Sequence, residues 1–169
     1  PTIECARKTP AMNGRIDPGE WGDNFATIGS HSRFAAAYNK ENIYFCWSVA
    51  GQGPLENGGD QFQRYFKTGG AVDVMIQTNP KADPDRNTPA NGDLRLLITR
   101  VKDQPRVVLY RAVAPGAPAG TDWSTSTTAG GTVSFQEVKL LKDVRVSHRG
   151  NDHTYIIEAA VPLKTLGLS

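Results

Sequence analysis

The stretch "RFAAAYNKENIYFCWSVAG", Arg33 to Gly51, contains two apolar runs separated by the polar segment Asn39–Asn42. The runs are rich in alanine, aromatic and β-branched residues, and the segment between them carries asparagine, lysine and glutamate. Apolar runs of about four to eight residues bounded by turn-forming residues are typical of β-strands. We therefore predict strands over Arg33–Tyr38 and Ile43–Ala50, and this pair indicates the fold class of the whole chain.

Similar runs recur along the sequence, punctuated by 17 glycines and 11 prolines. Further strands are predicted over Thr2–Lys8, Ala71–Thr78, Asp93–Arg100, Arg106–Val113, Thr132–Val138, Asp143–His148 and Thr154–Val161. Helical patterns are confined to Gly59–Lys67 and Pro162–Leu168, each for a turn or two. Many short strands with almost no helix indicate an all-β, antiparallel, two-sheet, jelly-roll-like β-sandwich with long loops.

The length of 169 residues fits a single domain spanning residues 1–169. The 19 Lys plus Arg and 17 Asp plus Glu are spread along the chain, so no basic stripe is present that would attract nucleic acid. No apolar run approaches the roughly 18 residues that a membrane span needs, and no secretory signal pattern opens the chain. We expect a soluble piece, already trimmed, of a larger protein.

Cys5 and Cys46 each lie in a predicted strand. They are too far apart in the sequence to form a metal-binding or thioredoxin-like pair. Two alternatives stay open: a disulfide between neighbouring strands, or two buried thiols that simply contribute to the core.

Several predicted strands mix apolar and charged residues on one face. In "DLRLLIT", Asp93 to Thr99, the side chain of Arg95 lies on the face opposite Leu94 and Leu96. One interpretation is a half-solvated face with cross-strand ion pairs, such as Arg95 with Asp73 or Glu158. The other is a shallow polar groove in which Arg95 contacts a ligand.

The stretch "GTDWSTSTTAGG", Gly120 to Gly131, holds Trp123 among residues that have no other large apolar side chain. Such a tryptophan either folds back onto the core or presents a flat face to a ligand, and flat rings suit the apolar faces of sugars. Trp123 and Tyr65 are the first candidates for ligand contact, and Trp47 is the third. The accompanying polar candidates are Asp60, Gln61 and Asp122. Phe62 and Phe66, four residues apart, are expected instead to dock a short helix.

The loop "DPDRNTPANGD", Asp83 to Asp93, begins like an oxygen-ligand calcium loop. Asp83, Asp85 and Asn87 repeat the D-x-D-x-N spacing that lets alternate side chains converge on one hard cation. The match then ends, because Thr88 stands where the turn glycine belongs. The loop therefore has two interpretations: a structural Ca²⁺ site formed by these three residues, or an ordinary loop with Asx turns.

No stretch matches a nucleophile elbow, a zinc-protease helix, a phosphate loop or a dinucleotide fingerprint. Carboxylates are numerous enough to supply the facing pair that a glycosidase needs. A small sandwich without a second lobe is nevertheless more often a binding module than an enzyme. We therefore expect a non-catalytic protein.

Four segments, taken in order, span both ends and the middle of the chain: "GRIDPGEWGDN" (Gly14–Asn24), Arg33–Gly51, "AVDVMIQT" (Ala71–Thr78) and "YIIEAAVPLKTLGL" (Tyr155–Leu168). Together they resemble the family-nine carbohydrate-binding modules and the related DOMON-like sandwiches. The resemblance implies a jelly-roll-like sandwich, an extracytoplasmic location and covalent attachment to neighbouring domains of a larger secreted protein. It also implies a sugar clamped between two aromatic rings, here Trp123 with Trp47 or Tyr65, and calcium ions that brace loops.

The same resemblance leaves two other functions open. Some DOMON-like domains bind a b-type haem through methionine with histidine or lysine, and Met75 with His148 is the candidate pair here, although a core methionine is the ordinary interpretation. The third possibility is an interaction or adhesion module without a small ligand.

Overall fold

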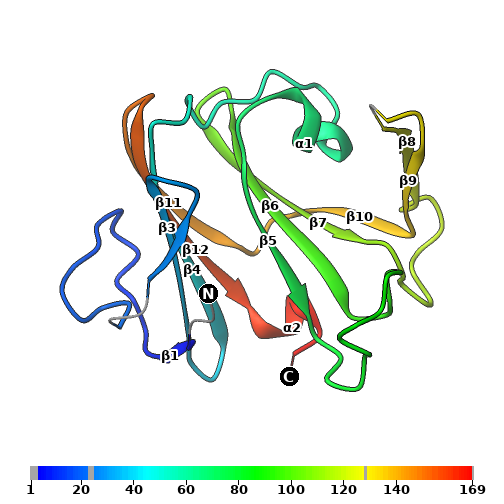
Figure 1. The fold of residues 1–169 in the computed structure, drawn as a ribbon, viewed down its shortest axis with the longest axis horizontal. Helices are drawn as coiled ribbons and strands as arrows, with labels where there is room; N and C mark the ends of the chain where they lie inside the picture. Colours follow the sequence, from blue (N-terminus) through cyan, green and yellow to red (C-terminus); the bar gives the residue numbers. More distant parts are fainter. Residues whose placement is uncertain (1–3, 23–24, 128, 169) are drawn as a thin grey trace. The chain divides into compact units, whose positions relative to one another are not determined.

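A computed structural model describes residues 4–22, 25–127 and 129–168 (Figure 1). Strands make up 46% of the structure and helix only 7%, and the strands form several antiparallel sheets. The predicted all-β class is therefore confirmed, and these proportions are those of a sandwich-like fold; the jelly-roll connectivity stays a prediction. The chain forms two compact units: unit 1 comprises Pro1–Pro54 and Asp143–Ser169, and unit 2 comprises Leu55–Lys142.

Unit 1 contains a six-stranded sheet with strand order β1-β3-β4-β12-β11 and with β2 paired to β3. All of its pairs are antiparallel except β1 with β3. Its elements are β1 (Ala6–Arg7), β2 (Ala26–Ile28), β3 (Ser32–Tyr38), β4 (Asn42–Ala50), β11 (Arg145–Gly150), β12 (Thr154–Pro162) and the short helix α2 (Leu163–Leu166).

The predicted hairpin Arg33–Ala50 is present as β3 and β4. Its turn is organised by Asn39, whose Oδ1 accepts the backbone N–H groups of Glu41 at 2.9 Å and Asn42 at 2.8 Å. Such an Asx-type turn satisfies the donors of the reversing backbone. The polar segment between the two apolar runs therefore sets the register in which Phe34 lies opposite Trp47.

One face of the unit 1 sheet is covered by the segment that precedes β2. Trp21 from this segment is 1% exposed and packs against a cluster of buried residues from the strands, namely Ala35, Ala37, Tyr44, Cys46 and Ala160. The small alanines leave room for the indole ring, which fills the face as close-packed interiors require. Trp21 is therefore part of the core of unit 1.

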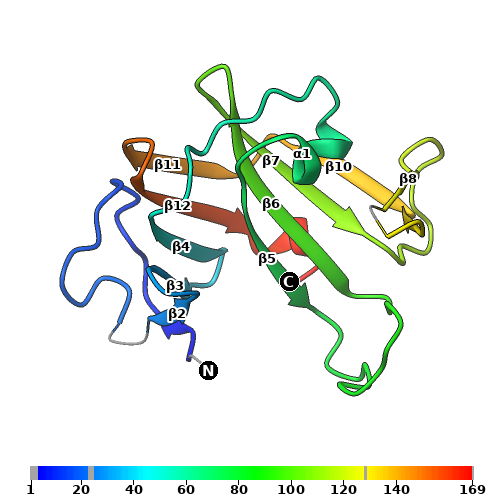
Figure 2. The same ribbon diagram turned by 45° about the horizontal axis from the view of Figure 1, so that its top comes forward.

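Unit 2 contains a four-stranded sheet of order β10-β7-β6-β5 and a two-stranded ribbon of β8 and β9. Its elements are the 3₁₀ turn η1 (Phe62–Arg64), α1 (Tyr65–Thr68), β5 (Val72–Gln77), β6 (Asp93–Val101), β7 (Gln104–Arg111), β8 (Trp123–Ser126), β9 (Thr132–Phe135) and β10 (Glu137–Leu141). Phe66 of α1 and Trp123 and Phe135 of the ribbon pack against buried residues of the sheet, so helix and ribbon cover the same face (Figure 2).

The structure shifts β7 (predicted as Arg106–Val113) and β11 (predicted as Asp143–His148) by two residues each, and it corrects two other predicted strands more strongly. The single strand Thr132–Val138 is divided at Gln136, because β9 pairs with β8 whereas β10 pairs with β7. Gln136 marks the change of partner: its Oε1 accepts the Ala114 N–H at 2.6 Å. The first strand is reduced to Ala6–Arg7, and residues 2 and 3 of the predicted span lie outside the described residues.

Two strands, β2 and β8, lie where loops were expected. The sequence of β8 is WSTS, so it has one apolar residue followed by three hydroxyl residues and shows no apolar alternation from which a strand could be predicted. Cys5 is exposed and Cys46 is fully buried, and both are free thiols. The disulfide alternative is thus not what the structure shows.

Candidate functional site

The segment Leu55–Gly70 of unit 2 is fixed by the buried side chain of Asn57, which is 4% exposed. Its Nδ2 donates to the Tyr65 carbonyl at 2.8 Å, and its Oδ1 accepts the Gly59 N–H at 3.0 Å and the Thr68 hydroxyl at 2.6 Å. A buried amide is stable when its donor and acceptor atoms are hydrogen-bonded, as they are here. Asn57 therefore determines where η1 and α1 place their aromatic rings.

These rings pack inward. Tyr65 is 5% exposed and belongs to the buried cluster of unit 2, and Phe66 contacts Tyr110 edge-on at 5.7 Å between ring centroids. The prediction that Phe66 docks the short helix is confirmed. Tyr65, which was predicted to contact a ligand, is a core residue of this unit and presents no open ring face.

Trp123 is half-buried at the start of β8, directly opposite Phe135 of β9. Its ring meets Phe66 edge-on, with centroids 6.0 Å apart and planes at 81°. This geometry is a favourable aromatic contact. Trp123 thus folds back onto the cluster with part of its surface exposed, which is closer to the core alternative than to a free-standing platform.

The remaining predicted aromatic, Trp47, lies in unit 1 and is 3% exposed. It packs against Phe34 at 5.4 Å and Phe45 at 5.9 Å. The predicted polar residues Asp60, Gln61 and Asp122 are exposed in unit 2. The structure therefore brings Tyr65, Trp123 and Arg95 to one face of unit 2, and it places Trp47 in the other unit.

A pocket of about 530 Å³ opens beside this cluster, and Arg95 is the predicted residue that lines it. Met75, Arg95 and Tyr110 are direct cross-strand partners on β5, β6 and β7, so they form one row of the same sheet face. Other lining residues come from the ends of β5 and β6, from the loop between them and from the ribbon, including Gln77, Asp93, Arg86, Pro89, Val133 and Phe135.

Arg95 is held at the pocket by an ion pair and by aromatic faces. Its Nε donates to Asp73 Oδ2 at 2.7 Å, and its Nη2 pairs with the same oxygen. The guanidinium carbon lies 5.2 Å from the Phe66 ring centroid and 5.9 Å from that of Tyr110, a favourable cation–π arrangement. The predicted Arg95–Asp73 ion pair is confirmed, and it gives the guanidinium one fixed orientation.

Tyr110 beneath Arg95 is 1% exposed. Burial raises its pKa, and the nearby positive charge of Arg95 offsets only part of this increase. The neutral phenol donates to the Phe62 carbonyl at 3.2 Å. Tyr110 therefore supports the pocket floor and carries no charge at physiological pH.

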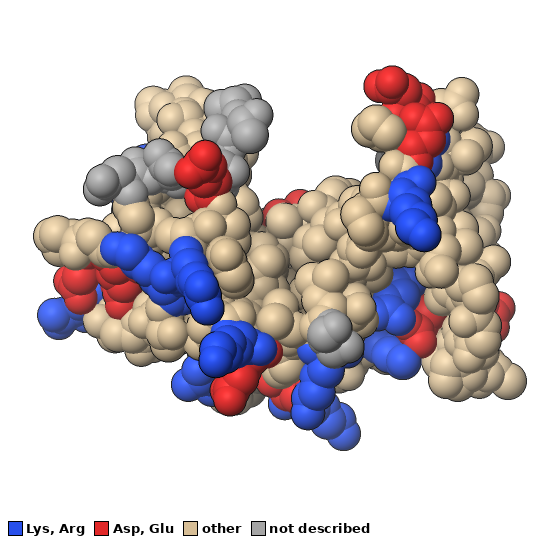
Figure 3. Space-filling view, turned by 90° about the horizontal axis from the view of Figure 1, so that it is seen from below, with Lys and Arg blue, Asp and Glu red and all other residues tan. Residues whose placement is uncertain are grey.

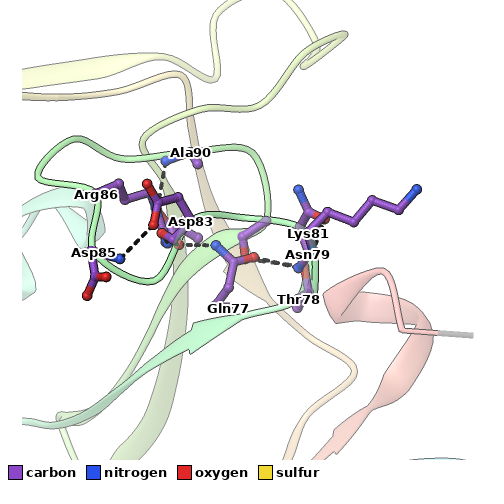
Figure 4. A network of polar contacts seen from close by, with 10 residues as sticks. Gln77, Thr78, Asn79, Lys81, Asp83, Asp85, Arg86 and Ala90 are labelled. Carbon is purple, nitrogen blue, oxygen red and sulfur yellow. Dashed lines mark hydrogen bonds and ion pairs between the residues drawn. The ribbon is translucent and has the colours of Figure 1, made fainter.

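The wall formed by the β5–β6 loop is organised around Arg86 (Figure 4). Its Nη1 donates to the Asp83 carbonyl at 2.6 Å, and its Nη2 pairs with Asp93 Oδ1. Asp93 also accepts from Gln77 Nε2 and, at 2.8 Å, from the Ala90 N–H. One guanidinium and one carboxylate thus connect both ends of the loop.

This network bears on the predicted calcium site. Asp83 Oδ1 accepts the Asp85 N–H at 2.9 Å, which is an Asx turn. Asp85 points away from the other labelled groups in Figure 4, while the Arg86 guanidinium binds the Asp83 carbonyl. Asp83 Oδ1 is thus used within the loop, and the calcium site at Asp83, Asp85 and Asn87 stays a prediction. No group of three or more His, Cys, Asp or Glu in the part of the chain that the structure describes is placed to hold a metal ion.

The proposed haem ligands lie in different units. Met75 is 69% exposed on β5 of unit 2, and His148 is on β11 of unit 1 with its ring 5.9 Å from that of Tyr155. Neither unit by itself holds this pair.

Glu158, the alternative partner of Arg95, is buried in unit 1 and is 0% exposed. Its Oε2 accepts the Gly14 N–H at 2.6 Å. Burial raises the pKa of this carboxyl, the nearby acids Glu20 and Asp17 raise it further, and the Gly14 bond and the Trp21 indole partly offset these effects. The alternative pairing of Arg95 with Glu158 is therefore not formed.

Sequence reasoning missed Arg86, Asp93, Gln77 and Phe135 as pocket residues. Arg86 lies in a polar loop, whereas Gln77, Asp93 and Phe135 lie in predicted strands, and neither setting marks a site. The one available signal was position, because Asp93 and Gln77 are the ends of two strands joined by a long loop.

Charges are of both signs over the surface seen in Figure 3, where basic and acidic side chains are interspersed. Among the described residues, no helix has the length and apolar character needed to cross a membrane. Comparison of the chain with family models, curated proteins and solved structures finds no match.

Proposed function

We propose that this chain is a non-catalytic carbohydrate-binding module whose ligand occupies the pocket of unit 2. The observation that carries the proposal is the combination of Arg95 with the apolar side chains of Met75 and Phe135 around one cavity of about 530 Å³. Small-molecule sites are typically about 300–1,000 Å³ and combine mostly apolar walls with a few oriented polar groups.

The polar groups suit sugar hydroxyls. Arg95 uses Nε and Nη2 for Asp73, and no partner of its Nη1 is found among the described residues, so this group is available to a ligand in the pocket that Arg95 lines. Gln77, Arg86 and Asp93 add an amide, a guanidinium and a carboxylate on the loop side. Charged side chains that are already oriented lose little conformational entropy when a hydroxyl binds.

The proposal revises the expected clamp. Phe135 takes the place of Tyr65 and Trp47 as the ring at the ligand, and Trp123 supports Phe135 from the adjacent strand. Trp123 is therefore expected to report on binding through its fluorescence, because it lies beside a residue that lines the pocket.

Titration with a panel of neutral and acidic oligosaccharides, followed by tryptophan fluorescence and calorimetry, tests the proposal. Arg95→Gln is expected to weaken binding about tenfold or more, since it removes a charged hydrogen-bond donor worth about 1.5–3 kcal/mol. Arg64→Gln is the matched control, because Arg64 is exposed on η1 and does not line the pocket. Uniform absence of binding across a glycan array would instead support an interaction or adhesion module, and a strong Soret band would support haem.

The proposal includes the setting that the family-nine resemblance implies, an extracytoplasmic position with covalently linked neighbouring domains. Fractionation of the source cells, with an antibody against this chain, tests the location and shows the size of the intact protein.

A further inference from the structure

The pocket of unit 2 has two chemically different walls, and this difference bears on which sugars it accepts. The inference rests on the proposed carbohydrate binding and names the class of sugar. A polar wall, called the loop wall, consists of Arg86 in the β5–β6 loop with Gln77 and Asp93 at the ends of the two strands, and an apolar wall consists of Val133 and Phe135 from β9. Met75, at the edge strand β5, adds an exposed apolar side chain to the lining.

The polar wall is largely occupied by its own bonds. Arg86 pairs with Asp93, and Asp93 also accepts from Gln77 and from the Ala90 N–H. Gln77 Oε1 in turn accepts the Asn79 N–H. The pocket therefore offers a ligand few free donors and acceptors, and Arg95 Nη1 is one of them.

The apolar wall offers no hydrogen-bonding side chain at all. Val133 and Phe135 are partly exposed, so their surfaces are available to a ligand. A hydroxyl pressed against such a wall loses its water without gaining a partner, which costs about 1–3 kcal/mol. A methyl group in the same place gains from leaving water instead.

We propose that the sugar recognised by this pocket carries a methyl-bearing substituent, either as a 6-deoxyhexose or as an O-acetylated sugar. The methyl group lies against Val133 and Phe135, and the remaining ring hydroxyls face Arg95 and the loop wall. The shared chemistry of the two ligand types is one methyl group on an otherwise polar ring.

Pairs of sugars that differ only at this group provide the test on the parent protein. Calorimetric titration compares L-fucose with L-galactose, L-rhamnose with L-mannose, and acetylated with deacetylated xylo-oligosaccharides. The methyl-bearing member of at least one pair is expected to bind about tenfold more tightly. A preference in the deoxy pairs identifies a 6-deoxyhexose, and a preference in the acetyl pair identifies an O-acetylated sugar.

The outcomes separate this inference from the proposed function. Binding with equal affinity within every pair, or binding confined to sugars without the methyl group, overturns the inference and leaves carbohydrate binding in place. If no sugar in these pairs or in the wider oligosaccharide panel binds, the proposed function itself fails.

A variant locates the methyl group. Val133→Thr keeps the shape of the side chain and adds a hydroxyl to the apolar wall, so it is expected to reduce the tenfold preference to about twofold or less. Val146→Thr makes the same change at a partly exposed position of β11 in unit 1 and is expected to leave the preference unchanged. If Val133→Thr retains its fold by circular dichroism and also retains the full preference, the methyl group does not contact this wall and the inference is wrong.

Discussion

Each unit has a sheet face covered by a segment from outside the sheet, and the two covers fill their faces to different degrees. In unit 1, Trp21 is 1% exposed and packs against Ala35, Ala37 and Cys46. In unit 2, Trp123 and Phe66 cover part of the face, and the rest opens as the pocket beside Arg95. The two tryptophans thus differ in burial: Trp21 is part of a buried core cluster, whereas Trp123 is half-buried on the face of unit 2 that carries the pocket.

The charged side chains on the two covered sheet faces also differ in burial: Glu158 of unit 1 is fully buried, whereas Arg95 of unit 2 is partly exposed. Among the described residues, Glu158 in unit 1 forms no ion pair. Burial of the Cys46 thiol and, after it, the negative charge of Glu158 raise the pKa of Cys46 to about 12. Arg95 in unit 2 is partly exposed and paired with Asp73. A partly exposed charged side chain such as Arg95 is accessible to a ligand. A buried carboxyl such as Glu158 instead makes the free energy of unfolding depend on pH.

The largest expected effect on the free energy of unfolding comes from removing the buried Trp21 ring of unit 1. Trp21→Ala removes a fully buried ring and is expected to lower the free energy of unfolding by about 3–5 kcal/mol. Trp123→Ala removes a half-buried ring and is expected to cost about 1–2 kcal/mol. Urea unfolding of both variants measures the difference, and Trp21→Phe serves if the alanine variant does not fold. Equal losses would show that the two tryptophans have the same structural role.

A second effect concerns how closely the covering segment approaches the unit 1 sheet. Gly14 has φ +73°, and a Cβ on it would lie 2.7 Å from Arg149 Cβ. Gly14→Ala therefore combines backbone strain with a steric clash. Gly19 has φ +74° and nothing within 4 Å of such a Cβ, so Gly19→Ala is the matched control for strain alone.

We expect Gly19→Ala to cost about 1 kcal/mol and Gly14→Ala about 1–3 kcal/mol more. Thermal unfolding of the two variants provides the comparison. Similar losses would mean that the segment yields at Gly14 and that the cover is less tightly held than the contact with Glu158 indicates.

The alternation of residues along the strands predicts which side chains share a sheet face, but it does not predict which segments cover that face. Period-two alternation placed Arg95 opposite Leu94 and paired it with Asp73, because side chains of a strand alternate regardless of what lies above the sheet. The same pattern does not reveal whether an aromatic residue such as Tyr65 or Trp47 is covered. That depends on segments distant in sequence, and the aromatic clamp was for this reason placed on residues that are buried.

The pocket walls were unpredictable for a related reason. The role of Arg86 arises when the β5–β6 loop closes and brings its guanidinium to Asp93, seven residues later, and to the Asp83 carbonyl. Spacing of carboxylates suggested a cation in this loop, and the side chain at its centre is a cation supplied by the chain itself. The calcium site itself stays a prediction.

The buried carboxyl of Glu158 in unit 1 predicts that the stability of the fold decreases as pH rises. The pKa of Glu158 is raised above its ordinary value of 4.5 in the folded state, so the folded state binds its proton more tightly than the unfolded state does. This contribution to stability is complete below about pH 4.5 and is lost as pH rises through the raised folded value, by at most about 1.4 kcal/mol per pH unit.

Glu158→Gln cannot titrate and still offers an oxygen to the Gly14 N–H. The difference in unfolding free energy, variant minus parent, is therefore expected to increase with pH above about 4.5 and then level off. Urea unfolding at several pH values measures it, and Glu4→Gln, at an exposed position, is the control. A difference that stays constant from about pH 4 to 8 would show that Glu158 has the same pKa in the folded and unfolded states.

The smallest expected effects concern the β5–β6 loop and test whether Arg86 or a calcium ion stabilises it. Asp83→Ala removes one exposed Asx-turn bond and is expected to cost about 0.5–1 kcal/mol, whereas Asp85→Ala removes a side chain whose backbone N–H is the donor in that bond and is expected to be near neutral. Because Arg86 already supplies the positive charge, millimolar Ca²⁺ is expected to leave the Tm of the parent and both variants unchanged. A Tm that rises with Ca²⁺ in the parent alone would assign the loop to a metal, since a ligand bound only by the folded state stabilises it by mass action. The open face of unit 2 would then be bordered by an ion and no longer by the Arg86–Asp93 pair.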